Sequence, residues 1–150
     1  MVIAVSLMSP QSRGQVSLRS AAPDAAPRIF HNYLHAEDDR RSMVAGLRAA
    51  LEIAGQPAMR KVITGPFDVP ASGSDADLLA HARRTIGTQF HGTATCAIGS
   101  VVNSDLQVFG LDGLRVVDAS VMPTLIRGNP NAPTIMIAEK AADLIKAAQH

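Results

Sequence analysis

Apolar side chains recur at helical spacing in two stretches of the chain, near residues 37–54 and after residue 130. Five of them in the first stretch share one stripe: Met43, Val44, Leu47, Leu51 and Ala54. This spacing predicts an amphipathic helix over about 37–54 that packs on a sheet. Acidic residues near the start of a helix and a glycine just after its end favour such a helix. Here these are Asp38 and Asp39 at the start and Gly55 at the end.

A shorter helix is predicted after a loop over residues 64–74 that is rich in proline and glycine. Ser74 is a suitable N-cap, and the helix should run to roughly Arg84 with Leu78, Leu79 and Ala82 facing inward. The last helix is the most apolar. It should begin with Asn131 as N-cap and Pro133 in its first turn, and continue through Ile145 to the end of the chain.

Alternating apolar and polar residues predict four short strands. Residues 2–8 and 15–19 should form a hairpin about a turn at 10–14, with Val16 and Leu18 on a buried face. Residues 106–109 and 114–118 should pair across the turn GLDG.

Composition narrows the class of protein. The chain has 150 residues, 47% of them apolar, and a net charge of +1, which suits one or two compact units and lacks the basic surface of a nucleic-acid-binding protein. The apolar start MVIAVSLM is too short for a membrane span and lacks signal-peptide flanks. The single cysteine, Cys96, excludes an internal disulfide and favours a reducing, cytoplasmic setting. The other histidines besides His91 show no metal-ligand spacing, so we expect no metal site. They are His31, His35, His81 and His150.

The segment from His91 to Lys140 carries the most specific motifs. His91 is followed by Thr95, Cys96 and Gly99, then by a strand ending in DAS at residues 118–120 and by GNPNAPT at 128–134. This combination resembles the C-terminal signature of the glucose-methanol-choline (GMC) flavoprotein oxidoreductases, whose histidine motif reads roughly H-P-V-G-T-C-x-M-G. Departures from this motif include Ala94, where glycine is usual, and Ile98, where methionine is usual.

The resemblance implies an α+β fold that crosses two domains. Residues 1–88 would be a partial substrate-binding (cap) domain, with part of an antiparallel sheet and its helices. Residues 89–150 would return to the FAD-binding domain and supply its C-terminal strand and helix. The GxGxxG turn with which the family begins is absent from these residues, so the chain looks like the C-terminal part of a flavoenzyme.

His91 is the candidate catalytic base. Oxidation of an alcohol needs a group that takes the hydroxyl proton, and an imidazole with a pKa of about 6.5 suits that task. Without the resemblance, His91 would more simply hydrogen-bond a loop carbonyl. Asn131 is the second candidate, because the resemblance implies that it hydrogen-bonds the substrate oxygen opposite His91. On physical grounds alone an N-cap role is as good an explanation.

FAD is the cofactor that the resemblance implies. Asp118, Ala119 and Ser120 would run beside its ribityl and pyrophosphate groups. The helix start would lie near the pyrimidine end of the flavin, where free N–H groups favour negative charge. The residues of that start are Asn129, Pro130, Asn131, Ala132, Pro133 and Thr134.

Three interpretations remain open at this point. The first is the C-terminal part of an FAD-dependent alcohol oxidoreductase, inactive alone, with a small alcohol as substrate and either dioxygen or another acceptor. The second divides the same chemistry between this chain and a separate FAD-binding chain. The third is an inactive remnant or self-associating α+β module, because the last strand and helix should leave apolar faces exposed.

Overall fold

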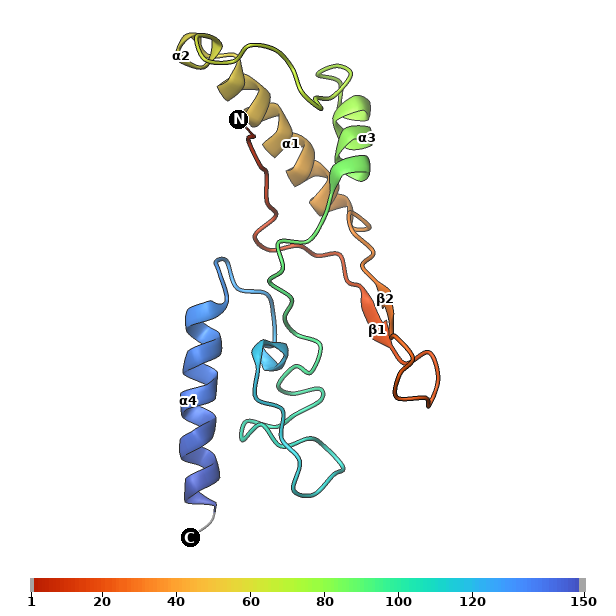
Figure 1. Cartoon of the computed structure of the whole chain (residues 1–150), viewed down its shortest axis with the longest axis vertical. Coiled ribbons are helices and arrows are strands. Elements are labelled where there is room, and N and C mark those ends of the chain that lie inside the picture. Colours follow the sequence, from red (N-terminus) through yellow and green to blue (C-terminus); the bar gives the residue numbers. More distant parts are fainter. Residues whose placement is uncertain (1, 149–150) are drawn as a thin grey trace. The chain divides into compact units, whose positions relative to one another are not determined.

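The computed structural model describes residues 2–148, and the chain divides into two compact units, residues 1–87 and 88–150. The first contains strands β1 (Gln15–Ser17) and β2 (Arg28–Phe30) and helices α1 (Glu37–Ala54), α2 (Pro57–Arg60) and α3 (Asp75–Thr85) (Figure 1). The second contains the 3-10 helix η1 (Ala119–Val121) and helix α4 (Asn131–Ala147). The predicted α+β class is confirmed. Met1, next to the predicted first strand, and His150 lie outside the described residues.

Helices α1 and α3 lie side by side in the first unit (Figure 1) and have the predicted bounds to within about a residue. Ser74 caps α3 as expected, accepting a hydrogen bond from the Asp77 N–H at 3.2 Å. The expectation that α1 packs on the sheet is wrong. Its buried face meets α3 and residues of the N-terminal segment, in a cluster built on Leu34, Met43 and Ala82.

The predicted N-terminal hairpin is also wrong. Residues 2–8 form no strand, and β1 pairs antiparallel with β2, with Val16 opposite Ile29. Gly14 permits this pairing, because a Cβ there would lie 2.2 Å from the Phe30 carbonyl oxygen. Val5 instead packs with the helical cluster. The expected burial of Val16 and Leu18 is contradicted as well, since these side chains are 54% and 84% exposed.

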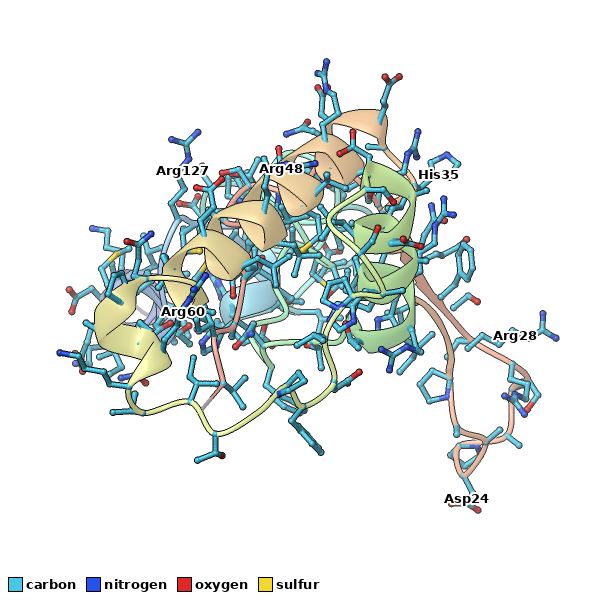
Figure 2. All side chains as sticks on the ribbon, turned by 90° about the horizontal axis from the view of Figure 1, so that it is seen from above. Asp24, Arg28, His35, Arg48, Arg60 and Arg127 are labelled. Carbon is cyan, nitrogen blue, oxygen red and sulfur yellow. The ribbon has the colours of Figure 1, made fainter. Side chains whose placement is uncertain are left out.

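The connection between β1 and β2, which contains Asp24, projects from the helices of its unit, and Arg28 begins β2 (Figure 2). The hairpin therefore contributes little to the core in this chain. Among residues 2–148, no helix combines the length and the apolar character needed to cross a bilayer.

The core of the second unit is a cluster of Val102, Leu106, Val121 and Ala141, with Ile137 and neighbouring valines packed around it. The two strands predicted at 106–109 and 114–118 are reduced to single bridges, of which Gln107 to Arg115 is one. The positive φ of Leu106, +64°, interrupts the extended backbone that a longer ladder would require.

Asp39 ties the N-terminal segment to the start of α1. It is 4% exposed, and its carboxylate accepts the backbone N–H groups of Gln11 at 2.8 Å and Ser12 at 2.7 Å. The Ser12 Oγ in turn accepts the Ala36 N–H at 3.0 Å. Burial by itself would raise the pKa of Asp39, but the hydrogen bonds from Ser12 and Gln11, with the charge of Arg13, together lower it.

The Asp39→Asn variant should lose about 2 kcal/mol of unfolding free energy at pH 7, because the charged acceptor of two backbone N–H groups is replaced by a neutral amide. Asp38→Asn is the matched control. Its ion pair with Arg41 is exposed, so its cost should stay below about 0.5 kcal/mol. Chemical denaturation followed by circular dichroism measures both.

The wild type and Asp39→Asn should also differ in how their free energy of unfolding depends on pH. The pKa of Asp39 is lower in the folded chain than its ordinary value of 3.8, so its stabilising effect is complete above that value. The effect is lost as pH falls through the folded pKa. The wild type should therefore lose its advantage over Asp39→Asn at acidic pH. Parallel stability curves from pH 7 to pH 2 would contradict this assignment.

Candidate functional site

His91 lies in an irregular segment between α3 and a turn at residues 95–96. The residue is partly buried, and within residues 2–148 its imidazole makes no hydrogen bond. Phe90 just before it is 89% exposed, and its N–H is donated to the Thr88 Oγ1 at 2.9 Å. The imidazole is therefore available to a ligand, as a catalytic base must be.

The backbone around His91 is left-handed at two non-glycine positions. Phe90 has a φ of +60° and Ala94 a φ of +68°. Ala94 stands where the family motif has glycine, and its φ lies in the region that glycine adopts without steric cost. The loop thus keeps a glycine-like backbone at this position although it carries a methyl group.

The DAS turn at residues 118–120 connects two segments of the second unit. The Asp118 Oδ1 accepts the Ser120 N–H at 2.7 Å and caps η1. The Ser120 carbonyl accepts the Cys96 N–H and the Val121 carbonyl accepts the Ile98 N–H, both at 2.9 Å. The segment that follows His91 is therefore held by backbone hydrogen bonds to η1.

Helix α4 is held to the same junction from the other side. Val121 of η1 is completely buried in one cluster with Ala141 and Ile137 of α4. The segment that follows His91 and helix α4 are therefore both attached to η1. In the described part of the chain, no hydrogen bond joins His91 to Asn131 directly.

The start of α4 differs from the prediction by one residue. Pro130 is the N-cap and Asn131 is the first helical residue, without a side-chain cap. Thr134 accounts for the shift, because its N–H and its Oγ1 both donate to the Pro130 carbonyl, at 2.9 and 2.6 Å. The N-cap role expected for Asn131 is therefore wrong, and its exposed amide is left for other partners.

The groups present at this helix start suit an anionic or carbonyl-bearing ligand such as a flavin. Within residues 2–148, the N–H groups of Asn131 and Ala132 have no hydrogen-bond partner, and Pro133 has no N–H. The Ala119 N–H is likewise unpaired in the described structure. Such a ligand requires exposed hydrogen-bond donors, and the partial positive charge of a helix start also favours it.

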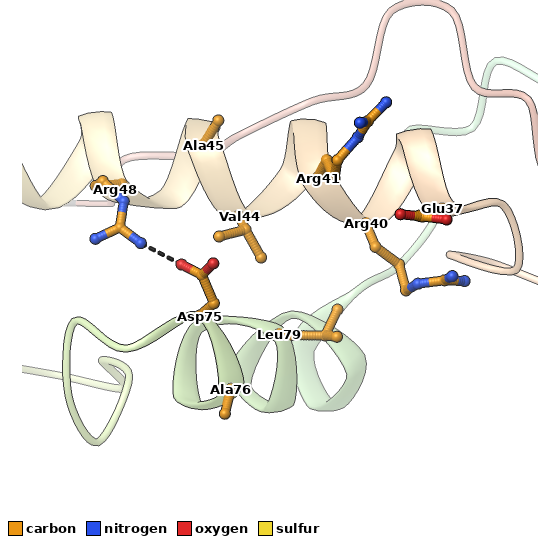
Figure 3. Close-up of a pocket in the computed structure, with 9 residues that line it drawn as sticks. All are labelled: Glu37, Arg40, Arg41, Val44, Ala45, Arg48, Asp75, Ala76 and Leu79. Carbon is orange, nitrogen blue, oxygen red and sulfur yellow. Dashed lines mark hydrogen bonds and ion pairs between the residues drawn. The ribbon is translucent and has the colours of Figure 1, made fainter.

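The structure also has an open pocket of about 510 Å³ between α1 and α3 (Figure 3). Its wall includes Arg48, which forms an ion pair with Asp75 and donates to the Gly73 carbonyl at 3.0 Å. Arg41 pairs with Asp38, and Arg40 donates to the Leu34 carbonyl. Because these cations are already partnered, the pocket is not a convincing anion site. None of the predicted site residues lines it.

Sequence reasoning missed the role of η1 as a junction. The Asp118 to Ser120 spacing is a signal for a capped turn, since an aspartate often accepts the N–H two residues later, but it does not indicate which segments the turn joins. It also missed the left-handed backbone of Phe90, for which the residue type gives no signal.

The chain belongs to the GMC oxidoreductase family, whose model matches residues 10–138. It is similar to the alcohol dehydrogenase [acceptor] of Pseudomonas putida, with 44% identity over 91% of this chain and 26% of that protein. It is also similar to the oxygen-dependent choline dehydrogenase of Photobacterium profundum, with 43% identity over 91% of this chain and 25% of that protein. The chain thus spans about a quarter of the length of these curated relatives.

Two solved structures give the same relationship. A formate oxidase of Aspergillus oryzae RIB40, from a study of FAD modification, is 29% identical with a TM-score of 0.87, and the match covers 95% of this chain and 26% of that one. An FAD-dependent oxidoreductase of Chaetomium thermophilum is 33% identical with a TM-score of 0.83, covering 94% and 26% respectively. The family and these FAD-dependent neighbours indicate FAD as the cofactor.

Ala94→Gly should raise the free energy of unfolding by about 1 kcal/mol, because glycine relieves the steric cost of the left-handed backbone. Ala97→Gly is the control. Ala97 has no positive φ, so the same change there should destabilise the chain. Thermal unfolding distinguishes the two, and a loss of stability in Ala94→Gly would contradict the assigned backbone conformation.

Proposed function

We propose that this chain supplies the C-terminal part of an FAD-dependent oxidoreductase that acts on a CH–OH group of a small alcohol. The main observation in its favour is that the segment after His91 and the helix that begins with Asn131 both contact η1. Backbone hydrogen bonds from Cys96 and Ile98 join the His91 segment to η1, and burial of Val121 joins η1 to the helix that begins with Asn131.

In this proposal His91 takes the hydroxyl proton of the alcohol. The Asn131 amide donates a hydrogen bond to the same oxygen, since an amide cannot act as a base. Bound FAD would supply the hydride acceptor. The N–H groups of Ala119, Asn131 and Ala132 would hold its polar edges, and the turn at Asp118 would keep them in place.

The two units have different roles in this proposal. Residues 1–88 form part of the substrate-binding domain, and residues 89–150 complete the FAD-binding domain. Catalysis then requires the part of the relatives that this chain does not match, whether it belongs to the same polypeptide or to a separate one. The free Cys96 fits a cytoplasmic setting.

An inactive, self-associating module is the second candidate. The observation that favours it is the number of exposed apolar side chains, among them Val16, Ile29 and Phe30 on the β1–β2 hairpin and Phe109 and Leu114 in the second unit. Sedimentation in the presence and absence of an FAD-binding part separates this candidate from the first.

His91→Ala should lower the rate of flavin reduction by alcohol about 10²- to 10⁴-fold in the chain assembled with an FAD-binding part. Anaerobic stopped-flow absorbance measures this rate, and the flavin content should be unchanged.

His81→Ala is the matched control for this variant. His81 belongs to α3, where its Nδ1 lies 3.1 Å from the Arg84 Nη2, so its loss should leave the rate within about twofold of the wild type. An unchanged rate in His91→Ala, at full flavin content, would remove His91 from the mechanism.

A further inference from the structure

The segment that carries His91 has almost no hydrogen bonds. In the part of the chain that the structure describes, residues 88–95 make a single one, in which the Phe90 N–H donates to the Thr88 Oγ1 at 2.9 Å. The next hydrogen bond along the chain joins the Cys96 N–H to the Ser120 carbonyl. The direction of the His91 side chain therefore depends on the backbone torsions of this segment and on the one bond within it.

Phe90 has a backbone conformation that phenylalanine rarely adopts. Its φ of +60° lies in the left-handed region, which has a steric cost for every residue with a Cβ atom. Its side chain is 89% exposed, so burial of the ring does not offset this cost. A hydrogen bond contributes a free energy of similar size. The conformation of Phe90 therefore depends on the bond to the Thr88 hydroxyl.

The torsions of Phe90 determine where His91 points. Peptide planes are rigid, so φ and ψ are the only soft torsions of the backbone. A change of φ at Phe90 from +60° to an ordinary negative value would turn the His91 backbone in a new direction. Strained backbone that its surroundings hold in place is concentrated at functional sites. At Phe90 this strain lies directly before the candidate base.

We propose that Thr88 is a positioning residue for the candidate base. Its hydroxyl holds Phe90 in the left-handed conformation, and this conformation sets the direction of the His91 imidazole. The inference rests on the proposed function of His91. Thr88 itself touches neither the alcohol nor the flavin, because it acts through the backbone of Phe90.

The first test uses NMR of the isotope-labelled 150-residue chain and compares Thr88→Val with Thr88→Ser. Valine keeps the branched shape of threonine but cannot accept a hydrogen bond, whereas serine keeps the hydroxyl. In Thr88→Val, the Cα chemical shift and the HN–Hα coupling of Phe90 should leave their left-handed values, and the signals of His91 should move. Thr88→Ser should keep the wild-type signals at both residues.

Thr85→Val is the matched control. The Thr85 hydroxyl also makes a hydrogen bond of 2.9 Å, which it donates to the His81 carbonyl within α3. Removal of this hydroxyl should therefore leave the signals of Phe90 and His91 unchanged. Both threonines are exposed, so neither valine variant should prevent folding, and circular dichroism checks this.

The second test is flavin reduction in the complete FAD-containing enzyme to which this chain contributes its C-terminal part. Thr88→Val should lower the limiting rate of reduction by alcohol about tenfold, because the base is misdirected. The alcohol concentration at half-saturation should change little, since proton removal is affected and binding is not. Thr88→Ser should restore the rate to within about twofold of the wild type.

A left-handed Phe90 in Thr88→Val, or equal signal changes in Thr85→Val, would overturn the proposal. So would a wild-type reduction rate in Thr88→Val when His91→Ala is slow, and that result would leave the proposed function intact. A wild-type rate in His91→Ala would instead contradict the proposed role of His91, so the two failures are distinguishable.

Discussion

Burial of Val121 in the short helix η1 is the constraint on which the candidate site depends. This side chain is completely buried against α4, while the carbonyls of Ser120 and Val121 hold the N–H groups of Cys96 and Ile98. One three-residue helix thus joins a loop and a helix that are about 40 residues apart in the sequence. The loop has little regular structure of its own, so its position relative to α4 is set by this junction.

The first unit is organised by a polar contact of the same kind. Asp39 fixes Gln11 and Ser12 at the start of α1, and the N-terminal segment then follows the helix instead of pairing with β1. The open pocket between α1 and α3 lies in this unit, but its arginines are occupied by neighbouring acids and carbonyls. Pocket volume alone would therefore have pointed away from the residues that the family motif identifies.

The sequence predicted the helices well because periodicity and caps are local signals. The stripe from Met43 to Ala54 and the Ser74 cap needed no tertiary information. The prediction of strand pairing failed because alternating residues indicate an extended, half-buried backbone but not which strand it pairs with. The close approach at Gly14, which the pairing of β1 with β2 requires, involves residues that are distant in the sequence.

The candidate site was predictable only in part. The motif identified His91 and Asn131, and their roles remain predictions. The one-residue shift of the α4 cap arose from Thr134, whose hydroxyl and N–H compete successfully for the Pro130 carbonyl. The function of η1 could not be predicted from a strand-end aspartate, because it depends on which segment donates to the carbonyls of Ser120 and Val121.

Amide NMR of the isotope-labelled chain, assembled with an FAD-binding part and compared with and without FAD, tests the central claim most directly. The account predicts that FAD shifts the signals of Ala119, Asn131 and Ala132, whose N–H groups are unpaired in the described structure. Shifts confined to the α1–α3 pocket, or unchanged signals at the start of α4 at full FAD occupancy, would contradict it.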